Sequence, residues 1–296
     1  MDKRNLGRTG LQVSPLGFGG AEIGYAGADA ATVSELLNSA LDAGLNVIDT
    51  AECYRDSEEL IGAAVSHRRD AYHLFTKCGH NTGFDLPDWD PAMLEQSIER
   101  SLKRLRTDRL DLVQLHSCSE ALLDQGDVIA VLQRARDAGK TRFIGYSGDR
   151  NDAAYAVDSG VFDTLQISIN IADQQPLESI LPAAAARNMG VIAKRPIANA
   201  AWTHAELPEN DYSRPYWDRL KALDYDFLRG RDAVATALRF TLSVPGVHTA
   251  IVGTTKPARW SQNTAYVEQG PLPAELYRSI LERWAAVALD DWTGQT

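Results

Sequence analysis

Short apolar segments rich in β-branched residues alternate with segments of helical periodicity along nearly the whole chain of 296 residues. Such short segments, bounded by turn residues, predict strands. They lie at about residues 16–20, 46–51, 73–78, 110–116, 141–148, 164–170, 190–196 and 247–254. Eight strands that alternate with helices favour parallel pairing through right-handed crossovers, and this chain length is typical of a (β/α)8 barrel.

The segments between the strands carry apolar residues at three- and four-residue spacing, which predicts amphipathic helices packed on the sheet. One such face consists of Val33, Leu36, Leu37, Ala40 and Leu41, and another of Leu94, Ile98, Leu102 and Leu105. Asp90-Pro91 indicates a helix start, and Ala43-Gly44 indicates a helix end.

An open, doubly wound sheet is the alternative architecture for this alternation of elements. That fold usually carries a G-x-G-x-x-G turn after its first strand, and Gly17-Phe18-Gly19-Gly20-Ala21-Glu22 does not fit the pattern. The barrel is therefore favoured. No linker, internal repeat or low-complexity tract indicates a second domain, so residues 1–296 are expected to form a single domain.

Two segments lie outside the alternation of strands and helices. Residues 4–13 predict a short hairpin that closes the bottom of the barrel. Residues 197–232 form a long insertion after the seventh strand, where the loops of this fold reach the catalytic face. The insertion is a candidate substrate lid, and it carries the aromatic residues Trp202, Tyr212, Tyr216, Trp217 and Tyr225.

The composition is that of a soluble globular enzyme, with 44% hydrophobic and 24% charged residues. A formal net charge of −10 argues against a broad surface that neutralises nucleic-acid phosphates. The first residues lack the apolar stretch that a signal peptide needs, and no later run approaches the ~20 apolar residues of a membrane span, so we expect neither. Three cysteines are an odd count that favours a reducing compartment. We expect a cytoplasmic protein without nucleic-acid or membrane partners, whose oligomeric state the sequence does not indicate.

Ionisable residues gather at predicted strand ends, where such a barrel carries its catalytic groups. Asp49, Lys77 and His116 lie at the ends of three successive strands, and Tyr54 follows shortly after Asp49; we call these four residues the tetrad. A tyrosine hydroxyl has a pKa near 10, which a neighbouring lysine ammonium is expected to lower. Asp49 would keep Lys77 charged, and His116 would polarise a carbonyl group by a hydrogen bond. The tetrad suits hydride delivery to a carbonyl carbon with proton transfer from Tyr54.

Each residue of the tetrad also has a purely structural interpretation. An aspartate or lysine at a strand end is often a cap or half of an ion pair. A single histidine is more often a hydrogen-bonded core residue than a catalyst, and a single tyrosine often serves only packing. Four such residues at neighbouring strand ends favour the catalytic interpretation, because burying aspartate and lysine without a purpose or a partner is costly.

These motifs resemble those of the aldo-keto reductase family, and the resemblance spans nearly the whole chain. Residues 6–19 look like the family's N-terminal hairpin and first strand. Asp49-Thr50-Ala51-Glu52-Cys53-Tyr54, followed by Ser57-Glu58, is similar to its D-T-A-x-x-Y signature, and Lys77 and His116 match its other two catalytic positions. The resemblance implies a (β/α)8 enzyme that reduces an aldehyde or ketone with NADPH, or oxidises the corresponding alcohol or sugar. In this reaction, the resemblance implies that Tyr54 is the general acid or base.

The resemblance also implies where NADP(H) binds. Contacts with the cofactor are expected at Gly19, Gly20, Asp49, Ser147, Gln166, Gly253, Thr254, Thr255, Lys256, Arg259, Gln262 and Asn263. A Gly-Thr-Thr turn before a helix N-terminus offers backbone N–H groups and hydroxyls to an anion. Arg259 can present its planar guanidinium to a 2′-phosphate, so we expect NADPH rather than NADH.

Two positions depart from the family pattern. The family's serine–asparagine pair is Ser147-Gly148 here, so the asparagine amide is missing. Lys194-Arg195-Pro196 stands where the family often places an aromatic residue against the nicotinamide. We expect Lys194 or Arg195 to meet the cofactor pyrophosphate, or a guanidinium to stack where the ring would be. The alternative is a solvated basic pair.

Other residues near the predicted mouth have no firm assignment. Tyr25, Trp89, Trp202 and Trp217 are candidates for an apolar or sugar-stacking pocket, but aromatic residues in loops as often serve packing. Cys53, Cys78 and Cys118 lie beside the catalytic positions. Because free cysteine is usually a small buried hydrophobe, we interpret all three as structural.

Other functions stay open on the sequence alone. A metal-dependent hydrolase would use Asp49 and His116, but no H-x-H or H-E-x-x-H spacing is present and no metal site is expected. A phosphosugar isomerase would use residues 253–255 and leave Tyr54 and Lys77 unexplained. A cofactor-sensing regulatory subunit with the same fold and little turnover is the main alternative, which the complete tetrad disfavours.

Overall fold

The computed structural model describes residues 2–209 and 212–295. Its centre is a closed barrel of parallel strands in the order β10-β3-β4-β5-β6-β7-β8-β9. The strands are β3 (Leu16–Gly19), β4 (Val47–Asp49), β5 (His73–Cys78), β6 (Leu110–His116), β7 (Thr141–Ser147), β8 (Thr164–Ser168), β9 (Gly190–Lys194) and β10 (Thr249–Val252). Each strand lies within the segment predicted for it, and the predicted (β/α)8 barrel is confirmed.

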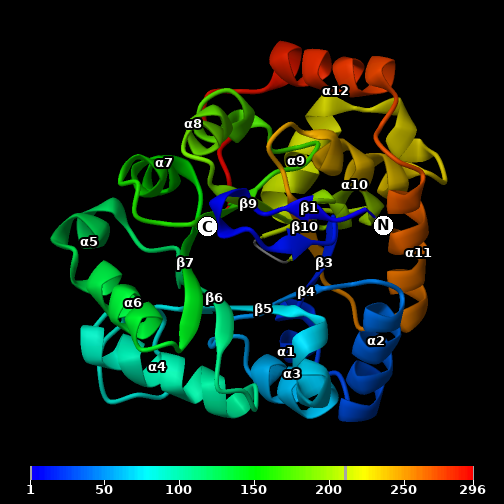
Figure 1. The fold of residues 1–296 in the computed structure, drawn as a ribbon. Helices are drawn as coiled ribbons and strands as arrows, with labels where there is room; N and C mark the ends of the chain where they lie inside the picture. The colour runs from blue at the N-terminus through cyan, green and yellow to red at the C-terminus, as the bar shows by residue number, and fades with distance from the viewer. Residues whose placement is uncertain (1, 210–211, 296) are drawn as a thin grey trace.

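Helices surround the barrel on all sides (Figure 1). Those that follow the eight strands in turn are α2 (Ala30–Asp42), α3 (Ser57–Val65), α4 (Pro91–Arg104), α6 (Asp127–Asp137), α7 (Arg150–Asp158), α8 (Ile180–Ala186), α10 (Ala233–Ser243) and α11 (Pro257–Glu268). The additional helices are α1 (Ala21–Tyr25), α5 (Glu120–Gln125), α9 (Arg214–Leu223) and α12 (Ala274–Val287). The predicted apolar face of α2 is buried, and α4 begins as predicted, since Asp90 accepts hydrogen bonds from the N–H groups of Ala92 and Met93.

The predicted N-terminal hairpin closes one end of the barrel. It consists of β1 (Arg4–Asn5), the 3-10 turn η1 (Gly7–Thr9) and β2 (Gln12–Val13), with β1 and β2 antiparallel. Its apolar side chains form a small core with residues from four strands; the members are Leu6, Leu11, Val13, Val47, Phe75, Leu112 and Ile192. Gly7 has φ +49°, and a Cβ there would lie 2.3 Å from the backbone nitrogen of Gly190, so only glycine fits this contact.

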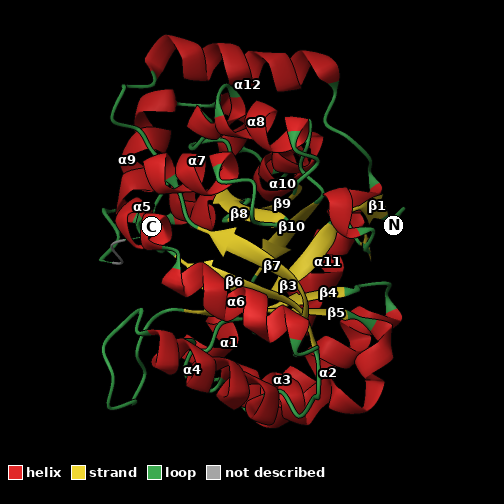
Figure 2. Ribbon diagram, turned by 60° about the vertical axis from the view of Figure 1, so that its left-hand side comes forward, coloured by secondary structure: helices red, strands yellow, loops and turns green. Residues whose placement is uncertain are grey.

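The opposite end of the barrel is the mouth, toward which the strand arrows point (Figure 2). Parallel pairing aligns the strand ends there: Gly19 is the register partner of Asp49, and His116 is the partner of Ser147. Ser147 is in turn the partner of Gln166. Residues that are far apart in sequence therefore reach one edge of the sheet together.

Two further segments contact Arg195, which directly follows β9. The insertion after β9 carries η4 (Ala198–Thr203), α9 and η5 (Asp226–Arg229), while its residues 210–211 lie outside the described ranges. The chain after α12 returns to the mouth, where three arginines donate hydrogen bonds to its backbone carbonyls. Arg219 binds Thr293 O at 2.8 Å, Arg150 binds Gly294 O at 2.9 Å, and Arg195 binds Gln295 O.

The twelve helices differ in length, but none within residues 2–209 and 212–295 is both long and apolar enough to cross a lipid bilayer.

Candidate active site

The four residues of the tetrad lie together at the mouth. Asp49 ends β4, Lys77 lies on β5, His116 ends β6, and Tyr54 lies in the loop between β4 and α3. Lys77 Nζ is 2.5 Å from Asp49 Oδ1 and donates a second hydrogen bond to the carbonyl of Thr50 at 2.7 Å. The same nitrogen lies 5.1 Å from the centre of the Tyr54 ring. The structure thus brings the predicted tetrad together around a buried lysine.

The second carboxylate oxygen of Asp49 is held by two side-chain amides. Gln166 Nε2 donates to Asp49 Oδ2 at 2.8 Å, and Gln114 Nε2 donates to the same atom at 3.2 Å. Ser147 Oγ donates to Gln166 Oε1 at 3.1 Å. Gln114 was not predicted from the sequence, although it lies two residues before His116 on one strand and so faces the same side of the sheet. Asp49 therefore has fixed partners on both of its oxygens.

Burial and neighbouring charges shift the pKa values of the tetrad. Burial tends to lower the pKa of Lys77, but Asp49 and Tyr54 outweigh this effect and raise the pKa above its usual value. Burial raises the pKa of Tyr54 by more than Lys77 lowers it. The expectation that the lysine would leave Tyr54 with a lowered pKa was therefore wrong, because the ring is more deeply desolvated than sequence spacing indicates. Tyr54 stays protonated at neutral pH and can donate a proton.

His116 is uncharged at neutral pH. Burial, followed by the charges of Lys77, His80, Lys194 and Arg195, places the pKa of His116 well below 6.5. A neutral imidazole carries one N–H donor and one acceptor nitrogen. The ring can therefore donate a hydrogen bond to a carbonyl oxygen without competing with Tyr54 as the acid.

Aromatic rings form the wall around Tyr54 and His116. The centres of the Tyr54 and His116 rings lie 5.6 Å apart, edge to face, and His80 lies 5.2 Å from His116. Trp89 packs against His80 at 5.6 Å, and Tyr25 lies 5.8 Å from Tyr54. Tyr25 and Trp89, two of the four aromatic residues singled out from the sequence, are thus close to the tetrad.

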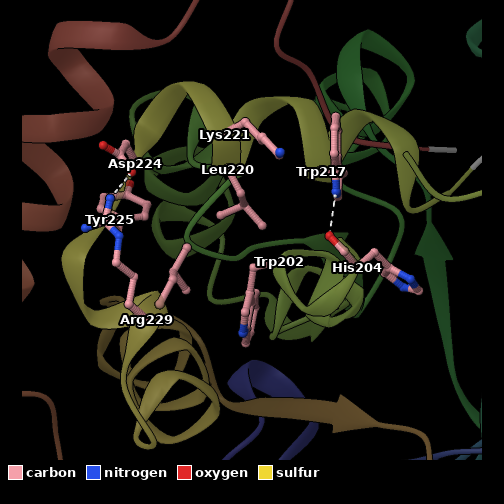
Figure 3. Close-up of a pocket in the computed structure, with 9 residues that line it drawn as sticks. Trp202, His204, Trp217, Leu220, Lys221, Asp224, Tyr225 and Arg229 are labelled. Carbon is pink, nitrogen blue, oxygen red and sulfur yellow. Dashed lines mark hydrogen bonds and ion pairs between the residues drawn. The ribbon is translucent and has the colours of Figure 1, made fainter. Parts of the chain in front are cut away.

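Trp202 and Trp217 occupy a separate groove in the insertion after β9 (Figure 3). The indole Nε1 of Trp217 donates to the carbonyl of His204 at 3.0 Å, and Lys221 Nζ lies 4.2 Å from the centre of the Trp217 ring. No residue of the tetrad is among the nine described residues that line this groove. The predicted set of aromatic residues is therefore divided between two places.

Lys194 and Arg195 are not the solvated basic pair considered above. Lys194 Nζ lies 2.8 Å from Asp149 Oδ2, and the side chains are 12% and 1% exposed. Arg195 donates to Ser168 Oγ at 2.9 Å and lies 5.0 Å from the centre of the Tyr212 ring. Asp149, directly after Gly148, was missed in the sequence because a loop position alone does not indicate that its carboxylate faces inward.

The predicted cofactor loop joins β10 to α11 and faces the end of β3. A Cβ added to Gly19 would lie 3.5 Å from the backbone nitrogen of Gly253, so the two glycines are neighbours. A Cβ on Gly20 would meet Ser57 Oγ at 2.6 Å, so this glycine serves close packing. Thr254 Oγ1 accepts a hydrogen bond from the N–H of Lys256 at 3.0 Å, while Thr255 is partly buried.

The first turns of α11 combine exposed and buried polar groups. Arg259 and Gln262 are exposed, whereas Asn263 is buried at 3% exposure. Burial raises the pKa of Glu22, and the positive charges of Arg259 and Lys256 act in the opposite direction. Among the described residues, the buried Asn263 Nδ2 has no hydrogen-bond partner. An unpaired amide donor on the same helix as an exposed arginine is compatible with a polar, anionic ligand.

Within residues 2–209 and 212–295, no group of three or more histidine, cysteine, aspartate or glutamate side chains is arranged to hold a metal ion.

Known proteins are similar to this chain in sequence and in fold. The model of the aldo/keto reductase family matches residues 15–284. L-galactose dehydrogenase of Arabidopsis thaliana is 30% identical over 290 residues, covering 91% of this chain and 89% of that protein. The holo form of aldo-keto reductase AKR11C1 from Bacillus halodurans is similar with a TM-score of 0.83 and 28% identity, over 99% of both chains. An aldo/keto reductase from Klebsiella pneumoniae, solved with NADP and acetate, has a TM-score of 0.73 and 25% identity over 95% of both chains.

Proposed function

The chain belongs to the aldo/keto reductase family, and on that premise we propose that it is an NADPH-dependent enzyme that interconverts a carbonyl group and an alcohol. The observation that carries the proposal is the buried Lys77–Asp49 pair directly beside the Tyr54 ring. A buried ion pair next to a protonated phenol has a clear catalytic use, because its positive end stabilises the phenolate that proton donation leaves behind. A single domain, residues 1–296, would carry the whole activity.

In the proposed mechanism, the carbonyl oxygen of the substrate lies between Tyr54 and His116. His116 donates a hydrogen bond to this oxygen and fixes its orientation. Bound NADPH supplies the hydride that reduces the carbonyl carbon. Tyr54 donates its hydroxyl proton to the oxygen, and Lys77, oriented by Asp49, stabilises the resulting phenolate. In the direction of alcohol oxidation, Tyr54 takes up the proton instead.

The residues proposed to hold the cofactor come from the ends of several strands and from the turn before α11. We propose that Ser147 and Gln166 bind the carboxamide of the nicotinamide, and that Asp49 is among the contacts beside them. Lys194 and Arg195 would bind the pyrophosphate. The turn of residues 253–256, with Gly19 and Gly20 behind it, would hold the adenosine phosphate together with Gln262 and Asn263.

Discrimination between NADPH and NADH would depend on Arg259. The charges of Arg259 and Lys256 act on the carboxylate of Glu22, whose pKa burial raises. A 2′-phosphate carries more charge and accepts a bidentate pair of hydrogen bonds from a guanidinium. NADPH is therefore the favoured cofactor, and the NADP-bound structure from Klebsiella pneumoniae supports this assignment.

The proposed substrate is a small aldehyde or ketone, or the corresponding alcohol or sugar. The similarity to L-galactose dehydrogenase supports a sugar, and so do Tyr25 and Trp89 near the tetrad, since aromatic faces stack on sugar rings. Cys53, Cys78 and Cys118 are free thiols, which supports a reducing, cytoplasmic location. Neither nucleic acid nor membrane is a proposed partner.

Steady-state oxidation of NADPH in the presence of 4-nitrobenzaldehyde, and reduction of NADP+ in the presence of aldoses, test this function. We expect turnover in at least one direction. Tight binding of NADPH without turnover in either direction would support the cofactor-sensing regulatory subunit instead.

A further inference from the structure

Cys53 precedes Tyr54 in the loop after β4, and its thiol faces the ring of His116. The distance from Cys53 Sγ to His116 Nδ1 is 3.4 Å, which is a hydrogen-bond distance for sulfur. The two residues are 63 positions apart in sequence, so only the barrel brings them together. The mechanism above assigns Cys53 no role, although its thiol lies at hydrogen-bond distance from a ring nitrogen of His116.

We propose that Cys53 is a positioning residue that sets the tautomer of His116: its S–H donates to Nδ1, so that the ring proton resides on Nε2 and is offered to the substrate oxygen. This inference rests on the proposed function, because the substrate's carbonyl oxygen is the acceptor for which the tautomer matters. The tautomer requires a hydrogen-bond donor to Nδ1, and a hydroxyl could replace the thiol in this role.

The direction of the hydrogen bond follows from the protonation states of the two groups. Burial raises the pKa of the Cys53 thiol to about 11, although Lys77 acts to lower it, so the sulfur carries its proton at neutral pH. The imidazole is neutral because its pKa is lowered. Sulfur is a weak acceptor, whereas an unprotonated imidazole nitrogen is a good one. The S–H···N arrangement is therefore favoured over N–H···S.

Neighbouring contacts hold both partners in place. The Tyr54 ring meets the His116 ring at an interplanar angle of 77°, and His80 contacts it at 62°. On the other side, Tyr25 donates a hydrogen bond to the carbonyl of Cys53 at 3.3 Å. The N–H of Glu52 is bound to Lys77 O at 3.1 Å, which ties this loop to β5. Ring rotation would break several of these contacts at once.

The opposite tautomer would be unproductive. With the proton on Nδ1, the Nε2 lone pair would face the lone pairs of the substrate oxygen, and the orienting hydrogen bond would be lost. Which nitrogen carries the proton is generally decided by the partner of the other nitrogen. The charged and titratable groups that face the ring are Cys53, Tyr54, Lys77, His80, Lys194 and Arg195. Of these, Cys53 is the hydrogen-bond partner of Nδ1.

The test is 15N NMR of the histidine side chains in the ligand-free protein at pH 7, where Nδ1–H and Nε2–H tautomers have distinct shifts. The His116 signals are assigned by their loss in His116→Phe. We compare wild type with Cys53→Ala, which removes the donor, and with Cys53→Ser, which retains one. Cys118→Ala is the matched control, because it removes a thiol that donates instead to Ser119 O at 3.7 Å.

We expect the Nε2–H tautomer in wild type, Cys53→Ser and Cys118→Ala, and a mixture of tautomers in Cys53→Ala. The kcat of Cys53→Ala should fall about fivefold to tenfold, which is the loss expected for one neutral hydrogen bond. The Kd of NADPH should not change in this variant, and Cys53→Ser should recover the wild-type kcat. An Nδ1–H tautomer in wild type, or an unchanged tautomer in Cys53→Ala, overturns the inference. The NMR spectra report the tautomer without catalytic turnover. If the expected tautomers are observed but the protein is inactive, the proposed function is refuted and this inference is not.

Discussion

The ammonium nitrogen of Lys194 lies 2.8 Å from Asp149 Oδ2, which makes a second lysine–aspartate pair at the mouth beside Lys77 and Asp49. Burial lowers the pKa of Lys194, and Asp149 acts in the opposite direction. Arg195 lies 3.9 Å from the same carboxylate oxygen, so two cations share one anion here. This side of the mouth therefore has an excess positive charge available to a phosphate group.

Lys194→Met should weaken the binding of NADPH by about tenfold, because one charge-assisted contact to the pyrophosphate is lost. The free energy of unfolding should also fall by about 3 kcal/mol, since Asp149 loses its close partner in a buried site. Fluorescence titration with NADPH and denaturant unfolding measure the two effects. Lys221→Met is the control, because Lys221 lies on the Trp217 ring outside the mouth. An unchanged affinity for NADPH in Lys194→Met contradicts the assignment.

Arg259→Ala should raise the Kd of NADPH by at least tenfold and leave the Kd of NADH nearly unchanged. The guanidinium is exposed on the first turn of α11, where it can meet the 2′-phosphate that only NADPH carries. Titrations of both cofactors with both proteins provide the comparison. If wild type binds NADH as well as NADPH, and Arg259→Ala changes neither, NADPH is not the preferred cofactor.

Glu52→Gln should loosen residues 79–90, the loop that carries His80 and Trp89. Glu52 is 1% exposed and binds the guanidinium groups of Arg100 and Arg104, and it accepts a hydrogen bond from Thr82 at 2.7 Å. Without the carboxylate, we expect KM for the carbonyl substrate to rise severalfold, with a loss of about 2 kcal/mol in the free energy of unfolding.

Glu59→Gln is the matched control for Glu52→Gln. Glu59 also pairs with Arg104, at 3.4 Å, but its side chain is 61% exposed, and exposed pairs contribute little to stability. If the two substitutions change KM equally, the contact of the buried Glu52 with residues 79–90 does not contribute to substrate binding.

Glu58→Gln should change how stability depends on pH. Burial raises the pKa of Glu58 from 4.5 to about 7. The folded state therefore holds this proton more tightly than the unfolded chain, and the resulting stability is present below pH 4.5 and lost as the pH rises through 7. Glutamine stays neutral, so the variant should gain up to about 3 kcal/mol relative to wild type between pH 4.5 and 8. Urea unfolding across this range measures the difference in the free energy of unfolding between the variant and wild type. A difference that does not vary with pH would show that burial does not raise the pKa of Glu58.

The barrel and the meeting of the tetrad could be predicted because both follow from local pattern. The sequence pattern of the strands placed Asp49, Lys77 and His116 at strand ends. In a parallel sheet, the carboxyl ends of all strands lie at the same edge. The hairpin was predictable for the same reason, from its turn residues and its apolar positions.

Other contacts depend on packing that no local pattern reports. The pairing of Lys194 with Asp149, and of Cys53 with His116, requires loop conformations that only the finished barrel imposes. The net rise in the pKa of Tyr54 depends on total burial, which is a sum over many neighbours. The three carbonyls of residues 293–295 reach Arg150, Arg195 and Arg219 across 144, 100 and 74 positions of the chain.

The central claim is that Tyr54 donates the proton while the rest of the mouth binds the cofactor. The most direct test is a titration of wild type and Tyr54→Phe with NADPH by protein fluorescence, followed by consumption of NADPH with 4-nitrobenzaldehyde. We predict equal binding by both proteins and turnover by wild type alone, with a loss of at least a hundredfold in Tyr54→Phe. Turnover by Tyr54→Phe at the wild-type rate, or failure of both proteins to bind NADPH, would contradict the account.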